Sequence, residues 1–185
     1  MGNNTKHSNK NSNSSIKYDS KTLNKWTMWA HLPHDTNWTL DSYKNIYTIS
    51  TIGEGISLIE CMSDTLVKNC MLFLMKEGVT PVWEDKANRE GGCFSYKVLN
   101  KNVYQSWKEL CYIILGDSIS SDNKFVDSVN GITISPKKNF CIIKIWLSNC
   151  NHQNPTIITK AITEMNANTC TVSYTHLRAH ETRGN

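Results

Sequence analysis

Polar and hydrophobic positions along the chain define two kinds of regular segment, separated by polar loops. Helical spacing of apolar residues appears twice, in residues 52–62 and 102–115. Short apolar or alternating runs typical of strands occupy residues 25–32, 43–49, 70–75, 94–99, 131–135 and 140–147. The order predicts an α+β fold, a curved antiparallel β-sheet with three helices packed on one face.

Local signals indicate where the helices begin and end. Thr51 and Glu54 have the spacing of a capping box at the start of the first helix, and Gly116 closes the second. A third helix is expected to begin at Asn154, because an Asn N-cap followed by Pro155 favours a helix start. Its predicted buried face consists of Ile158, Ala161, Ile162 and Met165.

The two ends of the chain differ from the part between them. Residues 1–23 are rich in Asn, Ser and Lys, so we expect a disordered tail. Residues 172–185 include VSYTHLRAHET, which resembles the in-frame translation of a transposon-based sequencing adapter. We interpret that segment as an artefact replacing the native C-terminus, and we give His176 and His180 no functional role. The folded domain is expected to span residues 24–171.

Length and hydropathy limit the class of protein. A chain of 185 residues fits a single domain. No run approaches the roughly 18 consecutive apolar residues of a membrane span, and the N-terminus lacks the apolar core of a secretory signal. We expect a cytoplasmic monomer with no membrane partner.

The distribution of charge limits contact with nucleic acid. The formal net charge is +4, and the first 25 residues hold five lysines against Asp19 alone. The remaining residues balance 15 basic against 15 acidic side chains. Any nucleic-acid contact should therefore be small and local.

The cysteines and histidines do not have the spacing of a metal site. Seven cysteines occur without a C-x-x-C pair, which predicts reduced thiols rather than disulfides. The nearest approaches to a ligand cluster are Cys150 with His152, and His31 with His34. We expect no metal and no cofactor.

Two of the six tryptophans are candidates for ligand binding. Trp38 and Trp83 lie in polar loops with little apolar sequence around them, whereas Trp26, Trp29, Trp107 and Trp146 lie in predicted strands or a helix and are expected in the core. Two exposed indoles can hold a flat base between them. The neighbouring Glu84 accepts hydrogen bonds only, so it favours the donor edge of guanine over adenine.

The predicted turn between residues 131–135 and 140–147 contains a pair of lysines, Lys137 and Lys138. Ammonium groups at a turn are suited to contact a phosphate chain. The residues therefore indicate a guanine nucleotide site with a basic phosphate contact.

With these residues the chain resembles a known family, the eukaryotic translation initiation factor 4E proteins, which bind the 5′ cap of mRNA. The resemblance rests on GVTPVWEDKANREGG at residues 78–92, preceded by NKWTMW at residues 24–29 and by Trp38. It extends from about residue 24 to residue 150 and includes Trp107 and the IKIW string that ends at Trp146.

The resemblance implies that 7-methylguanosine binds in a slot on the concave face of the sheet, with the helices on the convex face. It makes Trp38 and Trp83 the stacking pair, Glu84 the residue that reads the guanine edge, and Trp146 a neighbour of the methyl group. Lys137 then falls at a phosphate contact. The implied partners are capped mRNA and a helical peptide of a scaffold initiation factor or a repressor.

Two phosphate positions depart from the family pattern. Cys93 stands where the family has an arginine, and Ile142 stands where it has a second basic residue. Lys144 lies two residues beyond Ile142, hence on the same strand face, and is expected to substitute for it.

The helical surface departs from the pattern as well. Ile56 occupies the position of the family's peptide-binding tryptophan, and Lys108 and Tyr112 replace leucines. The positions that fit the family pattern are Ile52, Glu109, Leu115 and Gly116. Binding of the usual scaffold peptide is expected to be weakened.

Three functions stay open from the sequence. The leading one is a non-catalytic protein that binds caps and recruits mRNA for translation, and the second is a divergent repressor or decoy that binds caps without the scaffold. The third is a nucleotide hydrolase that uses Glu84 and Asp85 as metal ligands or general base.

Overall fold

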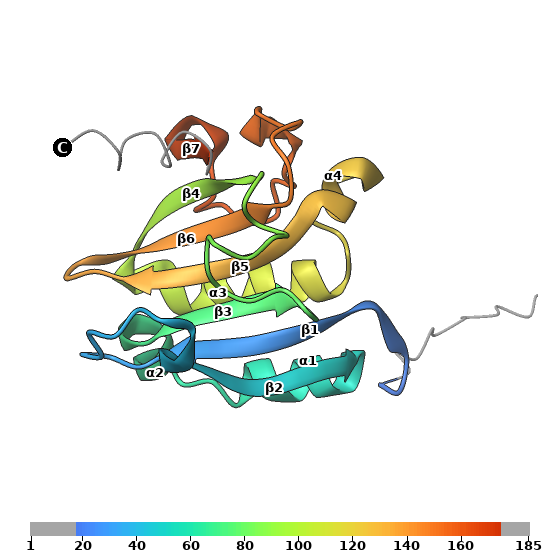
Figure 1. Cartoon of the computed structure of the whole chain (residues 1–185). Helices are drawn as coiled ribbons and strands as arrows, with labels where there is room; N and C mark the ends of the chain where they lie inside the picture. Colours follow the sequence, from blue (N-terminus) through green and yellow to red (C-terminus); the bar gives the residue numbers. More distant parts are fainter. Residues whose placement is uncertain (1–17, 175–185) are drawn as a thin grey trace, which may run out of the picture.

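Seven antiparallel strands form one curved sheet in the order β2-β1-β3-β5-β6-β4-β7 (Figure 1). The computed structural model describes residues 18–174, so residues 1–17 of the predicted tail and residues 175–185 of the predicted adapter segment lie outside the described part. The strands are β1 (Lys21–His31), β2 (Tyr43–Thr51), β3 (Met71–Lys76), β4 (Gly92–Leu99), β5 (Val129–Pro136), β6 (Phe140–Leu147) and β7 (Cys170–Tyr174).

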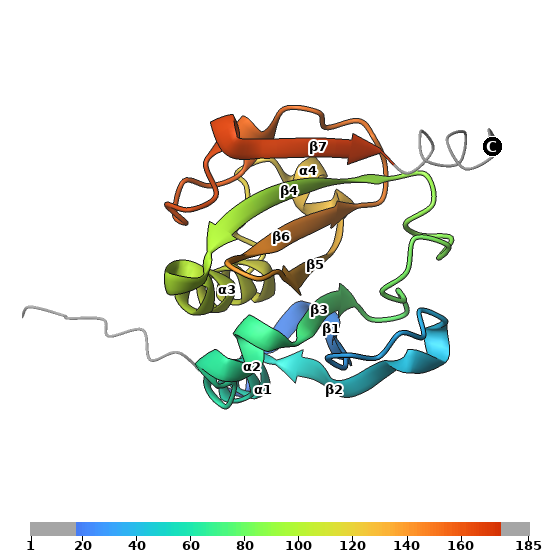
Figure 2. The same cartoon turned by 90° about the vertical axis from the view of Figure 1, so that its left-hand side faces the viewer.

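Helices cover one face of the sheet, and long loops lie over the other (Figure 2). The helices are α1 (Ile52–Glu60), α2 (Asp64–Asn69), α3 (Asn100–Leu115) and α4 (Asn123–Ser128), with short 3-10 turns η1 (Leu40–Ser42), η2 (Pro155–Ile157) and η3 (Ala167–Thr169). The loops that follow β1 and β3 cross the face opposite α1, α2 and α3. The prediction of an α+β fold with an antiparallel sheet is confirmed.

Burial and capping explain why α1 and α3 form where they do. Thr51 accepts a hydrogen bond from the backbone N–H of Glu54, and the Glu54 carboxylate accepts one from the N–H of Thr51, which confirms the capping box. Trp107 of α3 is fully buried against the sheet, and Trp26 of β1 is 2% exposed, as their core assignment requires. No helix among residues 18–174 is long and apolar enough to cross a bilayer.

The predicted third helix is wrong. Asn154 does accept a hydrogen bond from Thr156, and Pro155 does occupy the first turn, but only η2 forms. The β-branched run from Thr156 to Thr159 disfavours propagation of that turn. Three of the four residues of its expected apolar face are nevertheless buried, namely Ile158, Ile162 and Met165, whereas Ala161 is exposed.

Three elements were not predicted. Helices α2 and α4 have six residues each, too few to show a helical period. Strand β7 pairs with β4 at the sheet edge and includes residues 172–174, which begin the predicted adapter segment. Helices α1, α2 and α3 lie on the convex face, and α4 buries Phe125 in the same hydrophobic core. No α-helix follows β6 within residues 18–174.

Candidate functional site

The loops after β1 and β3 and the strands β2, β3, β5 and β6 line a cavity of about 280 Å³. Trp38 comes from the loop after β1, and Trp83 and Glu84 come from the loop after β3. Trp146 of β6 and Phe73 of β3 line the sheet side of the cavity. The structure thus brings together the two loop indoles, the acidic neighbour and the strand tryptophan.

Trp38 stacks on a histidine. The rings of Trp38 and His31 lie 4.2 Å apart with an interplanar angle of 2°, while Trp38 itself stays 60% exposed. His31 Nε2 lies 2.8 Å from the carbonyl oxygen of Asn37, and because a carbonyl only accepts, Nε2 is the nitrogen that bears hydrogen. One face of the exposed indole is therefore supported by a buried, oriented imidazole.

Sequence reasoning missed this role for His31, because it weighed the residue only as a metal ligand. A signal was present in the strand pattern. His31 lies two residues after Trp29 in β1, and alternate residues of a strand share a face. Both side chains therefore belong to the face on which the loop of Trp38 lies.

Trp83 stacks on Trp146. Their ring centroids lie 4.0 Å apart at 19°, and the Nζ of Lys144 lies 5.5 Å from the centroid of Trp83. Trp146 is 3% exposed, and its indole N–H donates to the hydroxyl of Thr133 across 2.7 Å. Trp146 is a core residue, as its strand position predicted, and it also lines the cavity.

A buried amide fixes the path of the loop after β3. Asn88, 1% exposed, donates through Nδ2 to the carbonyl oxygens of Thr80 and Val82, at 3.1 and 2.9 Å. Its Oδ1 accepts a 2.9 Å hydrogen bond from Nδ2 of Asn130 in β5. The segment immediately before Trp83 is thereby tied to the sheet.

Asp85 stabilises the same loop from within. Its carboxylate accepts hydrogen bonds from the backbone N–H groups of Thr80 and Ala87, both at 2.8 Å, and from the hydroxyl of Thr80. Partial burial acts to raise the pKa of Asp85, but these hydrogen bonds outweigh it and hold the pKa below its usual range. Asp85 is ionised and committed to the loop.

Glu84 is exposed and lies close to Tyr43 on the wall of the cavity. Burial, together with the negative charge of Glu84, raises the pKa of the Tyr43 phenol. The backbone carbonyl of Glu84 accepts a 3.2 Å hydrogen bond from Arg89. The side chain carboxylate is therefore placed at the cavity by a loop whose backbone is held independently of it.

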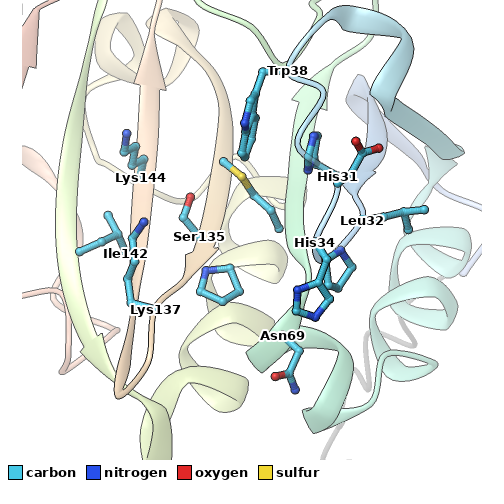
Figure 3. A pocket seen from close by; sticks show the side chains of 13 residues that line it. His31, Leu32, His34, Trp38, Asn69, Ser135, Lys137, Ile142 and Lys144 are labelled. Atoms are coloured by element: carbon cyan, nitrogen blue, oxygen red, sulfur yellow. The ribbon is translucent and has the colours of Figure 1, made fainter.

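A second cavity of about 630 Å³ adjoins the first and shares Trp38, Met71 and Lys144 with it (Figure 3). Lys137 and Ile142 line this larger cavity. Because Ile142 and Lys144 both line it, the prediction that they share a strand face is confirmed.

The phosphate candidate Lys138, and Cys93 at the position of the family's arginine, both lie outside the two cavities. Lys138 is exposed in the β5–β6 turn and lines neither cavity. Cys93 is 1% exposed, pairs with Trp146 in the strand register and lies with its Sγ 3.4 Å from the Ser95 hydroxyl. It too lines neither cavity.

A hydrogen-bonded cluster that the sequence did not predict connects α1 and α3 on the helical surface. Glu60 of α1 accepts a 2.6 Å charge-assisted bond from Lys108 of α3 and a second bond from the hydroxyl of Tyr112. These contacts lower the pKa of Glu60 and raise the pKa of Lys108, and the hydrogen bond between the two side chains is the largest cause of both shifts. The Lys108 charge is thus already neutralised by α1.

The remaining predicted partner residues surround this cluster. Ile52 and Ile56 are half-buried on α1, and Glu109 accepts a hydrogen bond from Gln105 on α3. Leu115 of α3 is 4% exposed and packs against Gly55 of α1. A Cβ atom at Gly55 would lie only 2.5 Å from the Leu115 side chain, so α1 and α3 approach closely there. Gly116 ends α3, with its N–H donating to the carbonyl of Tyr112.

The fold and the site together define an α+β protein with an aromatic cavity between two loops on the open face of a curved sheet. The family model described as eukaryotic initiation factor 4E matches residues 21–184. The chain belongs to the eukaryotic initiation factor 4E family.

Curated relatives are similar at modest identity. A translation initiation factor 4E homolog of Acanthamoeba polyphaga mimivirus is 27% identical over 136 residues, which cover 62% of this chain and 50% of the relative. The initiation factor NCBP of Oryza sativa is 34% identical over 117 residues, 61% of this chain and 49% of the relative. The chain thus spans about half the length of these two relatives.

Solved structures share the fold. A schistosome eIF4E complexed with m7GpppA and 4E-BP superposes with a TM-score of 0.75 at 19% identity, covering 91% of this chain and 95% of that one. A Caenorhabditis elegans eIF4E-3, solved with the 4E-binding protein Mextli and a cap analog, gives a TM-score of 0.63 at 24% identity over 71% of this chain and 75% of that one.

Proposed function

We propose that this chain binds the 7-methylguanosine 5′ cap of mRNA and recruits capped mRNA for translation initiation in the cytoplasm. The observation that carries the proposal is the convergence of Trp38, Trp83 and Glu84, from two separate loops, on one cavity. Membership of the initiation factor 4E family supports it.

The methylated base stacks between the outward face of Trp38 and Trp83. Methylation at N7 makes the base a cation, which strengthens its attraction to two indole faces. Lys144 already places a positive charge over Trp83, at 5.5 Å from the ring centroid. We infer that the base cation replaces the ammonium there and that Lys144 moves toward the phosphates.

The other side chains set the orientation of the ligand. Glu84 accepts the N1–H and amino hydrogens of guanine, and Trp146 lies beside the methyl group. Lys137 and Lys144 contact the phosphate chain, and Lys138 adds positive charge at its outer end.

We propose a binding protein without catalytic activity. Asp85, a candidate ligand or base in the hydrolase alternative, has both carboxylate oxygens engaged by the loop. Within residues 18–174 there is no group of three or more His, Cys, Asp or Glu side chains positioned to hold a metal ion. Metal-assisted hydrolysis at Glu84 therefore has no support in this site.

A second function, a divergent repressor or decoy, is favoured by one observation. Lys108 and Tyr112 of α3 both bond to Glu60 of α1, on the surface where the family receives a helical peptide. A protein that binds caps but engages the scaffold weakly would sequester mRNA. Calorimetric titration with the scaffold peptide separates the two functions, because ordinary affinity favours recruitment and weak binding favours sequestration.

Removal of either loop indole tests the proposed pocket. Trp38→Ala and Trp83→Ala are each expected to lose about 2 kcal/mol or more of binding free energy for 7-methyl-GTP, because each removes one stacking face. Isothermal calorimetry is the suitable readout, since the substitutions change the fluorescence. The matched control is Tyr18→Ala, an exposed aromatic outside both cavities. Unchanged affinity in either tryptophan variant would place the ligand elsewhere.

A further inference from the structure

Four exposed lysines lie at the end of the sheet where β5 turns into β6. Lys137 and Lys138 belong to the turn itself, Lys97 to β4 and Lys101 to α3, and these four residues are called the lysine surface below. From residue 26 on, the chain balances 15 basic against 15 acidic side chains, so four cations at one place are a local excess. Such an excess favours an anionic partner.

Hydrogen bonds hold the start of α3 against the β5–β6 turn. The backbone N–H of Asn100, the first residue of α3, donates to the carbonyl oxygen of Asn139 across 3.5 Å. Nδ2 of the same residue donates to the carbonyl oxygen of Lys138 across 3.4 Å. Because Lys101 follows Asn100 in the chain, the segments that bear Lys101 and Lys138 are direct neighbours.

Lys97 extends the lysine surface onto the open face of the sheet. It pairs with Ile142 in the register of β4 and β6, and paired residues of antiparallel strands point to the same face. Ile142 lines the larger cavity together with Lys137 and Lys144. The Nζ of Lys97 lies 4.5 Å from the ring centroid of Phe140, which places the ammonium group over β6. Cations therefore continue from the edge of the base cavity to the start of α3.

The stability of the fold does not account for these lysines. None of the three ion pairs described within residues 18–174 includes any of them. Lys101 lies in the first turn of α3, where the positive end of the helix dipole disfavours a cation. That turn contains no acidic residue, and Leu99 at the N-cap position makes no side-chain hydrogen bond. The helix end therefore adds partial positive charge to the lysine surface.

Two carboxylates limit where an anion can lie. Glu164 accepts a 2.7 Å hydrogen bond from Nδ2 of Asn102 in the first turn of α3, so it lowers the positive charge there without balancing four lysines. Asp35, from the loop after β1, lines the larger cavity. A phosphate chain that leaves the base cavity is repelled by Asp35 and attracted by Lys144 and Lys137, so it is favoured along the β5–β6 hairpin.

We propose that the lysine surface binds the RNA chain downstream of the cap, through its phosphates and without reading its sequence. The proposal rests on the cap-binding function above. RNA is the partner because the lysine surface continues from Lys144 and Lys137, which contact the cap phosphates in that function, and because a cap is the end of an RNA chain. A single strand has one negative charge per nucleotide, which suits a line of ammonium groups.

The test compares two ligands in three proteins. The ligands are the dinucleotide m7GpppG and a short unstructured oligoribonucleotide with the same cap, which differ only in the RNA chain. The proteins are the wild type, Lys97→Gln/Lys101→Gln, and the control Lys44→Gln/Lys124→Gln, which makes the same change in net charge at exposed residues of β2 and α4. Helix α4 and the β5–β6 turn lie at opposite ends of the sheet (Figure 1). Dissociation constants are measured over a series of salt concentrations, with thermal unfolding as a check on folding.

We expect the wild type to bind the capped oligoribonucleotide more tightly than m7GpppG at low salt, with an advantage that shrinks as salt is raised. Lys97→Gln/Lys101→Gln should lose about three- to tenfold in affinity for the oligoribonucleotide and keep its affinity for m7GpppG. Its plot of log affinity against log salt should be shallower by about 1 to 1.5. The control variant should match the wild type with both ligands.

Three results would overturn the RNA surface and leave cap binding in place. They are an unchanged affinity of Lys97→Gln/Lys101→Gln for the oligoribonucleotide, an equal loss for both ligands, and an equal loss in the control variant. Failure of the wild type to bind m7GpppG would instead overturn the proposed function, and the RNA surface with it. The two failures are therefore distinguishable.

Discussion

The contact between Trp38 and His31 orients an exposed indole before a ligand binds. A ligand that stacks on an already oriented ring binds more tightly, because the entropy of ordering the side chain is then lost on folding and not on binding. The imidazole lies flat under Trp38 at 4.2 Å and is itself fixed by Asn37. His31 thus acts as a positioning residue for the stacking pair.

Substitution of His31 separates the effect of its aromatic ring from the effect of its hydrogen bond to Asn37. His31→Ala should weaken 7-methyl-GTP binding by about 1 kcal/mol, in the range of an aromatic pair, whereas His31→Phe should retain most of the affinity. Titration of both variants, with thermal unfolding as a check on folding, measures this. Equal affinity of the alanine variant and the wild type would show that Trp38 needs no support.

At the scale of elements, the loop after β3 depends on one buried amide. Asn88→Ala would leave the carbonyls of Thr80 and Val82 and the amide of Asn130 without that partner. We expect a loss of about 1–3 kcal/mol in unfolding free energy, together with weaker binding of 7-methyl-GTP, because the loop bears Trp83.

Urea unfolding and calorimetry on the same samples measure both effects. Glu90→Ala is the matched control, since Glu90 is an exposed residue of the same loop. A variant that keeps wild-type stability and affinity would mean that the loop conformation is set by other contacts.

The contact between α1 and α3 determines the partner surface. A helical peptide docks by placing apolar anchors in a groove, where an indole contributes more than its share of the binding energy. Here Ile56 offers a smaller surface, and Lys108 is paired with Glu60 at 2.6 Å, so a peptide must displace or avoid that pair.

The usual scaffold peptide should therefore bind at least roughly tenfold more weakly than it binds family members that retain the tryptophan, a loss of about 1.4 kcal/mol. Ile56→Trp combined with Lys108→Leu should recover part of that loss. Calorimetry showing ordinary affinity in the unmodified chain would refute this and favour a recruiting factor over a repressor.

At the scale of the whole molecule, the central strands and the two long helices follow from the sequence because their patterns are long and regular. Strand β6 matches its predicted bounds, and α3 begins two residues earlier than predicted. The C-terminal helix fails although its start signal is correct, because a cap cannot offset a run of β-branched residues. Six-residue helices such as α2 depend on tertiary packing and have no periodic signal to detect.

The candidate site was predictable only in part. Trp38, Trp83 and Glu84 could be selected from the sequence because indoles and a carboxylate in polar loops have little apolar sequence to pack against. The structure places all three at one cavity. The His31 support is local in sequence and was indicated only by the strand pattern. The Asn88 bridge to Asn130 was not predictable, because these residues are 42 positions apart and meet only in the folded chain. The same holds for the bond between Glu60 and Lys108, which are 48 residues apart.

The central claim is tested most directly by intrinsic tryptophan fluorescence during titration with 7-methyl-GTP and, separately, with GTP. Both ligands have the same triphosphate, so the comparison isolates the positive charge that N7 methylation gives the base. The account predicts strong quenching by 7-methyl-GTP at concentrations where GTP quenches little, because the cation adds to both stacking contacts and to the attraction of Glu84. Equal quenching curves for the two nucleotides would contradict it.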